Sequence, residues 1–194
     1  MFKLYIFDMG GVVSRNTNVA PEVSAYLEFD GAEMIEFARD DFKALTTGAI
    51  SIEEFTRRFS LKSGRAIEDD LLTRFFHPEL DRDVMDTIDT LKNGARVVAG
   101  TNTITPHYDV HLQKGDYEIF DAVYASHLMG LAKPDPHFFT YILDREGCSP
   151  EQALFVDDVP ANVEAAKKLG IPSFVFTNAE KLKKDLTALK LQAV

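Results

Sequence analysis

Five short apolar runs, each followed by polar or turn-forming residues, constrain the fold more than any other feature of this sequence. The runs barely alternate between apolar and polar residues, as expected of strands that are covered on both faces. They lie at 4–7 (LYIF), 96–100 (RVVAG), 122–126 (AVYAS), 153–156 (ALFV) and 173–176 (SFVF). Helical patterns follow three of them, at 135–146, 160–169 and 178–190. This alternation predicts an α/β fold with a doubly wound parallel sheet.

A long helical segment interrupts the alternation between the first and second predicted strands. Ser51 and Glu54 have the spacing of a capping box, so we expect a helix to begin at Ser51. Four phenylalanines at helical spacing are expected to form a local core: Phe37, Phe42, Phe55 and Phe59. The helical patterns cover roughly 20–28, 31–46, 51–60 and 66–76, and 81–92 leads back to the second strand. We therefore predict a Rossmann-like core from residues 1–13 and 87–194, with an inserted all-α cap from residues 14–86.

Charge and cysteine content limit the class of partner. The net charge is −10, with 31 acidic residues against 21 lysines and arginines. This balance argues against binding nucleic acid or an anionic membrane, because phosphate backbones are bound by clustered cations. One cysteine cannot form an intramolecular disulfide, no apolar run approaches the length of a membrane span, and the N-terminus lacks signal-peptide features. We expect a cytoplasmic protein with a small-molecule partner, and its oligomeric state stays open.

Polar residues collect where the predicted strands end, and parallel strands bring these ends to one edge of the sheet. The residues are Asp8, Thr101, Asn102, Lys133, Asp157 and Asp158. Three neighbouring carboxylates repel one another, and a Mg²⁺ ion with oxygen ligands relieves that repulsion. Lys133 and Thr101 could then hold a phosphate by charge and hydrogen bond. Asp8, at the end of the first strand, could attack the phosphorus and form an aspartyl-phosphate.

Four segments together resemble the motifs of the haloacid dehalogenase-like (HAD) superfamily. They are YIFDMGGVV, VVAGTN, GLAKPDP and ALFVDDVPANVEAAKKLG, in the family's order and each at a predicted strand end. The resemblance covers nearly the whole chain, and the short first motif is similar to that of small glucose-1-phosphate-phosphatase-like members. It implies a Mg²⁺-dependent phosphatase acting on a small phosphorylated metabolite, with Asp8 as nucleophile. It also implies metal ligation by Asp8, the Gly10 backbone carbonyl, Asp158 and Asp157, and phosphate binding by Thr101, Asn102 and Lys133.

Gly10 departs from the pattern of most phosphatases in this family, which carry an aspartate two residues after the nucleophile as general acid and base. A glycine keeps the carbonyl that binds metal and lacks the acid. General acid–base catalysis contributes typically ~10²–10⁴-fold in rate. We therefore expect turnover of activated esters, such as anomeric sugar phosphates, acyl phosphates or aryl phosphates, or an acid borrowed from the cap or from water. A sugar 1-phosphate is the substrate that this argument favours.

Three alternatives remain open from the sequence. A metal-independent haloacid dehalogenase would also use Asp8, although dehalogenases usually carry tyrosine where this chain has Gly10. A phosphonate hydrolase tolerates a small residue there but needs a cap lysine, for which Lys43 and Lys62 are weak candidates. A weakly active binding or regulatory protein on the same scaffold would tolerate Gly10, yet it has no physical reason to keep mutually repelling acids.

Two further groups of residues carry weaker signals. His107 and His111 have the i, i+4 spacing of zinc ligands on one helix face, but no third ligand accompanies them. We expect them to be packed or solvated. Arg15, Asn16 and Lys43 could face a substrate from the cap, although an ordinary surface position is the simpler expectation.

Overall fold

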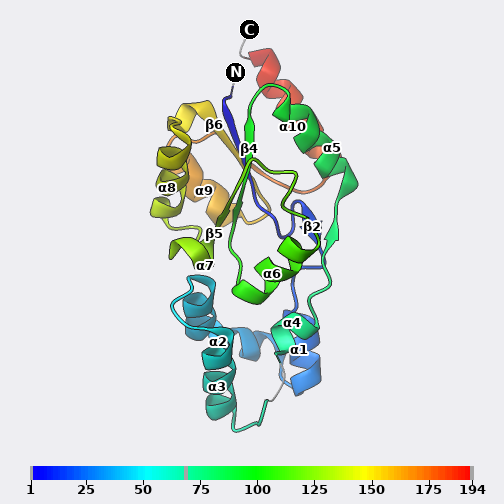
Figure 1. The fold of residues 1–194 in the computed structure, drawn as a ribbon, viewed down its shortest axis with the longest axis vertical. Coiled ribbons are helices and arrows are strands. Elements are labelled where there is room, and N and C mark those ends of the chain that lie inside the picture. Colours follow the sequence, from blue (N-terminus) through cyan, green and yellow to red (C-terminus); the bar gives the residue numbers. More distant parts are fainter. Residues whose placement is uncertain (1, 68–69, 193–194) are drawn as a thin grey trace.

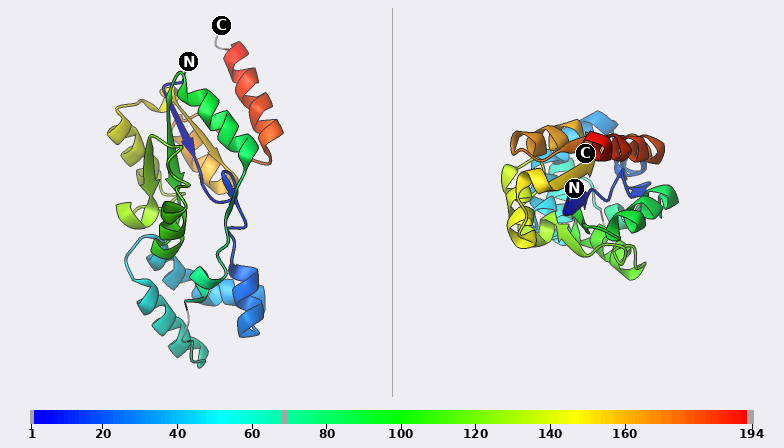
Figure 2. Two further views of the ribbon diagram at one scale, coloured as in Figure 1. Left: turned by 45° about the vertical axis from the view of Figure 1, so that its right-hand side comes forward. Right: turned by 90° about the horizontal axis from the view of Figure 1, so that it is seen from above.

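The computed structural model describes residues 2–67 and 70–192 and contains a five-stranded parallel sheet with helices on both faces (Figures 1 and 2). The strand order is β5-β4-β1-β6-β7. The strands are β1 Leu4–Phe7, β4 Arg96–Thr101, β5 Ala122–Ala125, β6 Ala153–Asp157 and β7 Ser173–Val175. Each lies within a residue or two of its predicted run, so the predicted doubly wound fold is confirmed.

Side chains that alternate along the strands build a separate core on each face of the sheet. Tyr5 and Phe7 of β1 pack toward α5 (Arg82–Lys92) and α10 (Ala179–Gln192). Leu4 and Ile6 pack on the other face, against α8 (Pro136–Glu146) and α9 (Pro160–Lys168). Strand β1 is buried along its whole length because both of its faces are covered.

The segment between β1 and β4 forms a helical layer beyond the carboxyl ends of the strands, at the end of the molecule opposite the two chain termini (Figure 1). Its helices are α1 Ala20–Leu27, α2 Gly31–Thr46, α3 Ile52–Ser63 and α4 Leu71–Arg74. They share a third apolar cluster of their own. Ser51 caps α3 as predicted, accepting a hydrogen bond from the amide of Glu54. These helices fit a cap.

Two predictions about this segment need correction. The helix expected at 66–76 is the single turn α4, and 68–69 of that range lie outside the described residues. Phe55 and Phe59 are buried in the cap cluster, but Phe42 is 43% exposed. Phe42 lies on the side of α2 that faces a cavity, which explains why helical spacing alone placed it in the core.

Two short strands connect the helical layer to the core. Strands β2 (Ser14–Arg15) and β3 (Glu79–Leu80) pair antiparallel, so the chain enters and leaves the layer at one place. Arg15 forms an ion pair with Asp81, which also caps α5. Helix α5 packs on the sheet, so the predicted boundary at residue 86 falls inside a core helix. The division into core and cap stays a prediction.

Three further helices complete the described structure: two follow strands β4 and β5 at their carboxyl ends, and a 3₁₀ turn comes directly before β6. They are α6 Thr105–Gln113, α7 Ser126–Met129 and the 3₁₀ turn Pro150–Gln152. No helix of the described residues is long and apolar enough to cross a membrane.

Candidate active site

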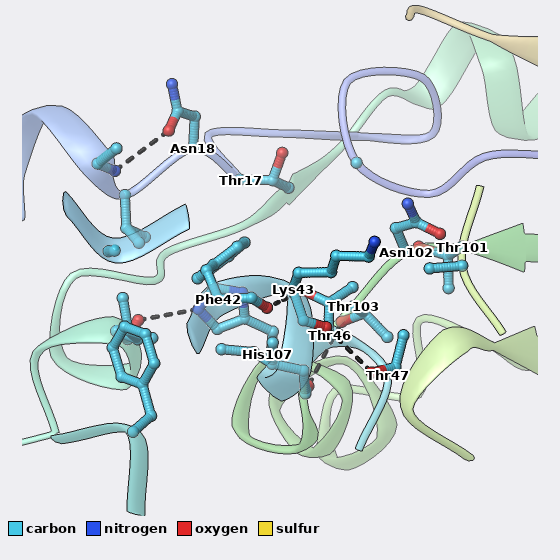
Figure 3. A pocket seen from close by; sticks show the side chains of 18 of the residues that line it. Thr17, Asn18, Phe42, Lys43, Thr46, Thr47, Thr101, Asn102, Thr103 and His107 are labelled. Carbon is cyan, nitrogen blue, oxygen red and sulfur yellow. Dashed lines mark hydrogen bonds between the residues drawn. The ribbon is translucent and has the colours of Figure 1, made fainter. Parts of the chain in front are cut away.

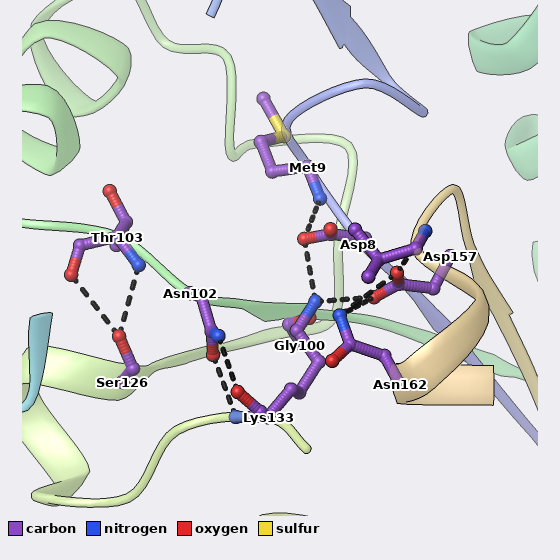
Figure 4. Close-up of polar contacts among 10 residues, drawn as sticks. Asp8, Met9, Gly100, Asn102, Thr103, Ser126, Lys133, Asp157 and Asn162 are labelled. Atoms are coloured by element: carbon purple, nitrogen blue, oxygen red, sulfur yellow. Dashed lines mark hydrogen bonds and ion pairs between the residues drawn. The ribbon is translucent and has the colours of Figure 1, made fainter. Parts of the chain in front are cut away.

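The predicted site residues converge at the carboxyl ends of β1, β4 and β6, which are neighbours in the sheet. The chain order runs from β1 to β4 on one side and reaches β6 on the other. Ligand sites in open α/β sheets form at such a reversal. Asp8 follows β1, Thr101 ends β4, and Asp157 ends β6. Figure 4 shows Asp8 and Asp157 on either side of Lys133.

Lys133 is the centre of the polar network. Its Nζ lies 2.8 Å from Asp8 Oδ1 and 2.7 Å from Asp157 Oδ2. It also donates a 2.8 Å hydrogen bond to the Gly100 carbonyl. Burial alone would lower the pKa of Lys133, but the two carboxylates outweigh burial and raise it. The lysine therefore stays positively charged and can form an ion pair with an anion bound beside Asp8.

Asp8 is a buried carboxylate with one oxygen bound and the other open. Its Oδ1 accepts hydrogen bonds from the Met9 amide at 2.7 Å and from Lys133. Burial, followed by the nearby Asp157, raises the Asp8 pKa to about 7, while Lys133 acts in the opposite direction. The described residues donate no hydrogen bond to Oδ2, so that oxygen is available for bonding to phosphorus or to a cation.

The two consecutive aspartates at the end of β6, Asp157 and Asp158, occupy different environments. Asp157 is fully buried, and besides Lys133 it accepts hydrogen bonds from the Asn162 side chain at 3.0 and 3.1 Å and from the Val159 amide at 2.8 Å. Asp158 is exposed as a residue. Partial burial of its carboxyl group, followed by the negative charge of Asp157, raises the pKa of Asp158. Asp157 thus holds the lysine in place, while Asp158 has free oxygen atoms.

One carboxyl oxygen from each of Asp8, Asp157 and Asp158 lies within 4.8 Å of the other two. Carboxylate oxygens are the ligands that Mg²⁺ prefers, and the ion usually keeps several waters beside one or two such ligands. A cation also relieves the repulsion that raises the pKa values of Asp8 and Asp158. This donor set fits Mg²⁺. Gly10 lies in the loop directly after Asp8 and lines the neighbouring cavity.

A tight loop holds Asp8 and Gly10 at the strand end. The amides of Val13 and Ser14 both donate to the Met9 carbonyl, and the Gly11 amide donates to Ser14. Gly11 has a φ of +75°, and a Cβ at this position would come within 2.2 Å of Asp158 Oδ2. Only glycine therefore permits the close approach of Asp158 to the loop.

The two remaining predicted site residues, Thr101 and Asn102, lie beside the cavity but make different contacts. Thr101 is buried at the end of β4 and lines the cavity. Asn102 exchanges two 2.8 Å hydrogen bonds with the backbone of Lys133, so it fixes the loop that carries the lysine (Figure 4). A phosphate-binding role for Thr101 and Asn102 stays a prediction.

Sequence reasoning missed Asn162 and Ser126. Asn162 lies in the first turn of α9, where its side chain returns to Asp157. A polar residue five positions after the first aspartate, at the start of an otherwise apolar helix face, was the available signal. Ser126 accepts a 3.0 Å hydrogen bond from the Thr103 amide and donates to the Thr46 carbonyl of the cap at 2.7 Å. No local sequence pattern predicts that long-range contact.

The histidine pair is packed, as expected. His107 stacks on Phe76 with ring centroids 3.7 Å apart and bonds to the Leu72 carbonyl at 2.9 Å. His111 bonds to Asp116 at 2.7 Å. Lys62, one of the two lysines considered for phosphonate chemistry, forms an ion pair with Asp41. Lys43 extends from α2 toward Asn102 and Thr101 (Figure 3).

Known proteins resemble this chain along most of its length. The family model described as haloacid dehalogenase-like hydrolase matches residues 2–170. A D-ribitol-5-phosphate phosphatase from Bacteroides thetaiotaomicron is 26% identical and covers 97% of this chain and 98% of its own length. A drimenol cyclase from Aspergillus calidoustus is 34% identical over 113 residues, and the chain spans only 21% of its length.

Solved structures show the same fold. A predicted HAD-like family hydrolase from Porphyromonas gingivalis has a TM-score of 0.82 and 28% identity, covering 97% of this chain and 98% of its own. An HAD family enzyme from B. thetaiotaomicron, solved as an Asp-to-Ala mutant with magnesium and inorganic phosphate, has a TM-score of 0.77 and 23% identity. It covers 91% of this chain and 95% of its own. The chain is therefore an enzyme of the haloacid dehalogenase-like hydrolase family.

Proposed function

We propose that this enzyme is a Mg²⁺-dependent phosphatase that hydrolyses a small organic phosphate monoester through an aspartyl-phosphate on Asp8. The observation that carries the proposal is the cluster of three carboxylates, two of which bind Lys133, with one oxygen of Asp8 left free. A full-length relative is named a phosphatase for D-ribitol 5-phosphate, and a solved relative binds magnesium with phosphate. Both support this reaction class.

The residues divide the chemistry between them. Bound Mg²⁺ would be held by Asp8, Asp158 and the Gly10 carbonyl, with Asp157 beside them, and would neutralise charge on the phosphate. Asp8 attacks phosphorus, the bond from phosphorus to the leaving oxygen breaks, and the departing oxygen takes a proton from water. Lys133 and Thr101 hold the phosphoryl oxygens during transfer. Water then hydrolyses the acyl phosphate and releases inorganic phosphate and free Asp8.

Asp157 and Asn102 position the lysine in this scheme. Asp157 fixes the ammonium of Lys133 by an ion pair, and Asn102 fixes the backbone of Lys133 by two hydrogen bonds. The absence of an acidic side chain at Gly10 supports a preference for leaving groups that depart without protonation, as the sequence suggested. Sugar 1-phosphates belong to that class, and a comparison with sugar 6-phosphates tests the leaving-group argument.

The phosphatase proposal is tested with p-nitrophenyl phosphate and Mg²⁺. We expect Asp8→Asn to abolish turnover, because an amide cannot act as the nucleophile, and we expect chelation of Mg²⁺ by EDTA to do the same reversibly. Asp144→Asn, on the far end of α8, serves as the matched control. Equal rates for wild type and Asp8→Asn would sink the proposal. Turnover of a 2-haloacid without metal would instead favour the dehalogenase alternative.

A further inference from the structure

A cavity of about 1230 Å³ opens directly beside the candidate catalytic residues and extends under the cap (Figure 3). Gly10, Thr101 and Lys133 lie at its core end. Its volume exceeds the ~300–1,000 Å³ of typical ligand pockets. The space is therefore much larger than a phosphate group with a short polar chain requires.

The cavity wall has two zones of different chemistry. The zone near the catalytic residues is polar and is lined by Thr17, Asn18, Lys43, Thr46, Thr47 and Asn102. The zone under the cap is largely apolar and is lined by Val23, Leu27, Met34, Phe55, Phe59 and Leu72, with Arg39, Thr56 and Asp70 as polar residues of the cap segment that also line the cavity. All six apolar side chains belong to the cap's own hydrophobic cluster. The inner wall of the cavity is thus one flank of the cap core.

The apolar zone selects what can occupy it. A sugar placed there would lose hydrogen bonds to water and find few partners, which costs free energy for every buried hydroxyl. A hydrocarbon or aromatic group would instead bury apolar area on both sides, complete the packing of the cap core, and release water. The polar zone lies between this wall and Lys133, so it suits the phosphate end of the same molecule.

We propose that the leaving group of the substrate is a bulky, largely apolar moiety, a hydrocarbon or aryl group carried as its phosphate monoester. This inference rests on the proposed phosphatase function and names its substrate class. It replaces the sugar favoured by sequence with a group matched to the cavity. An aryl ester satisfies both constraints, because a phenolate departs without a general acid and its ring fits the apolar zone.

The test is a series of 4-alkylphenyl phosphates from the unsubstituted phenyl ester to the hexyl ester, assayed with Mg²⁺. Their leaving oxygens have nearly the same acidity, so differences in kcat/KM report binding of the chain. We expect kcat/KM to rise by up to roughly fourfold per added methylene until the cavity is filled, from ~0.8 kcal/mol per buried CH₂. Glucose 1-phosphate and ribitol 5-phosphate should be poorer substrates than the hexyl ester. A flat series, or a preference for the sugar phosphates, would overturn the inference.

A cavity-filling variant locates the effect. Ala38 of α2 lines the cavity, so Ala38→Phe should lower kcat/KM for the hexyl ester at least tenfold while the phenyl ester changes little. Ala25→Phe on the exposed side of α1 is the matched control and should leave the series unchanged. Equal behaviour of the two variants would contradict the proposed occupant, provided that both keep the wild-type circular dichroism spectrum.

A binding measurement separates this inference from the phosphatase proposal. The corresponding 4-alkylphenylphosphonates cannot be hydrolysed, and calorimetry measures their affinity directly. Affinity that rises with chain length, without turnover of any ester, would support the apolar binding site and contradict the phosphatase proposal. Turnover of p-nitrophenyl phosphate with affinity independent of chain length would uphold the phosphatase and defeat the apolar site.

Discussion

The two glycines that follow Met9, Gly10 and Gly11, have different physical reasons to be glycine. Gly11 requires a left-handed backbone and leaves room for Asp158, so any side chain there would displace a candidate metal ligand. At Gly10 a Cβ would lie 3.1 Å from Thr17 Oγ1, a tight contact that a small shift of Thr17 relieves. The threonine hydroxyl therefore occupies part of the space where a side chain at position 10 would begin.

Restoring the acid at Gly10 should consequently require a change at Thr17. We expect Gly10→Asp alone to gain little, and Gly10→Asp combined with Thr17→Ala to raise kcat for simple alkyl phosphates toward the ~10²–10⁴-fold that acid catalysis typically supplies. Thr17→Ala alone is the control, and p-nitrophenyl phosphate, whose leaving group needs no acid, should change far less. If the double variant gains nothing on alkyl phosphates, the missing acid is not the limitation.

At the scale of elements, α6 joins the core to the cap through a partly buried histidine, His107. His107 stacks on Phe76 and bonds to the carbonyl of Leu72 in α4, so a core helix and a cap helix share this contact. Burial lowers the His107 pKa to about 4 from its usual value near 6.5, with the Leu72 carbonyl and Asp70 opposing this. The folded protein therefore keeps the ring neutral where the unfolded chain would already bind a proton.

That difference predicts acid sensitivity with a definite sign. The stability from neutral His107 is fully present above pH 6.5 and is lost as the pH falls toward 4, because the unfolded state binds more protons in this window. The loss amounts to about 3 kcal/mol at most. The urea midpoint of the wild type should be lower at pH 5 than at pH 7, and we expect His107→Gln to make this difference smaller. His77→Gln, at an exposed position, is the control and should leave the difference unchanged. An unchanged slope in His107→Gln would assign the acid sensitivity to other groups.

At the scale of the whole molecule, local patterns predicted the core and its site far better than the contacts between parts. Buried strands and capped helices are set by residues near each other in sequence, so 4–7 and 153–156 were recognisable as strands. The pairing of β2 with β3 joins two-residue segments, which are too short to carry a pattern. The same holds for the cavity, because its walls come from side chains on four cap helices and several core loops.

Ser126 illustrates such a long-range contact and can be tested. Its hydroxyl is fully buried and links the Thr103 amide to the Thr46 carbonyl of α2. We expect Ser126→Ala to cost about 1–3 kcal/mol of unfolding free energy, since both partners lose a buried hydrogen bond. Ser63→Ala is the control, because that hydroxyl bonds only to the Ser60 carbonyl and the Arg65 amide, both close to the end of α3. Calorimetric unfolding measures both variants, and equal midpoints would show that the cap docks without this serine.

The antiparallel pairing of β2 with β3 brings Arg15 opposite Glu79. A two-residue turn between them would convert two linkers into one ordinary hairpin, a connection that proteins use often. Exchanging everything between these two residues for another helical module would keep β1, Lys133 and the paired aspartates in the sequence, and would remove the contacts that Ser126 and His107 make with Thr46 and Leu72. Replacement of the helical layer at this one place would change much of the cavity wall while keeping Asp8, Lys133 and the paired aspartates, so we expect substrate choice to change by exchange of this layer.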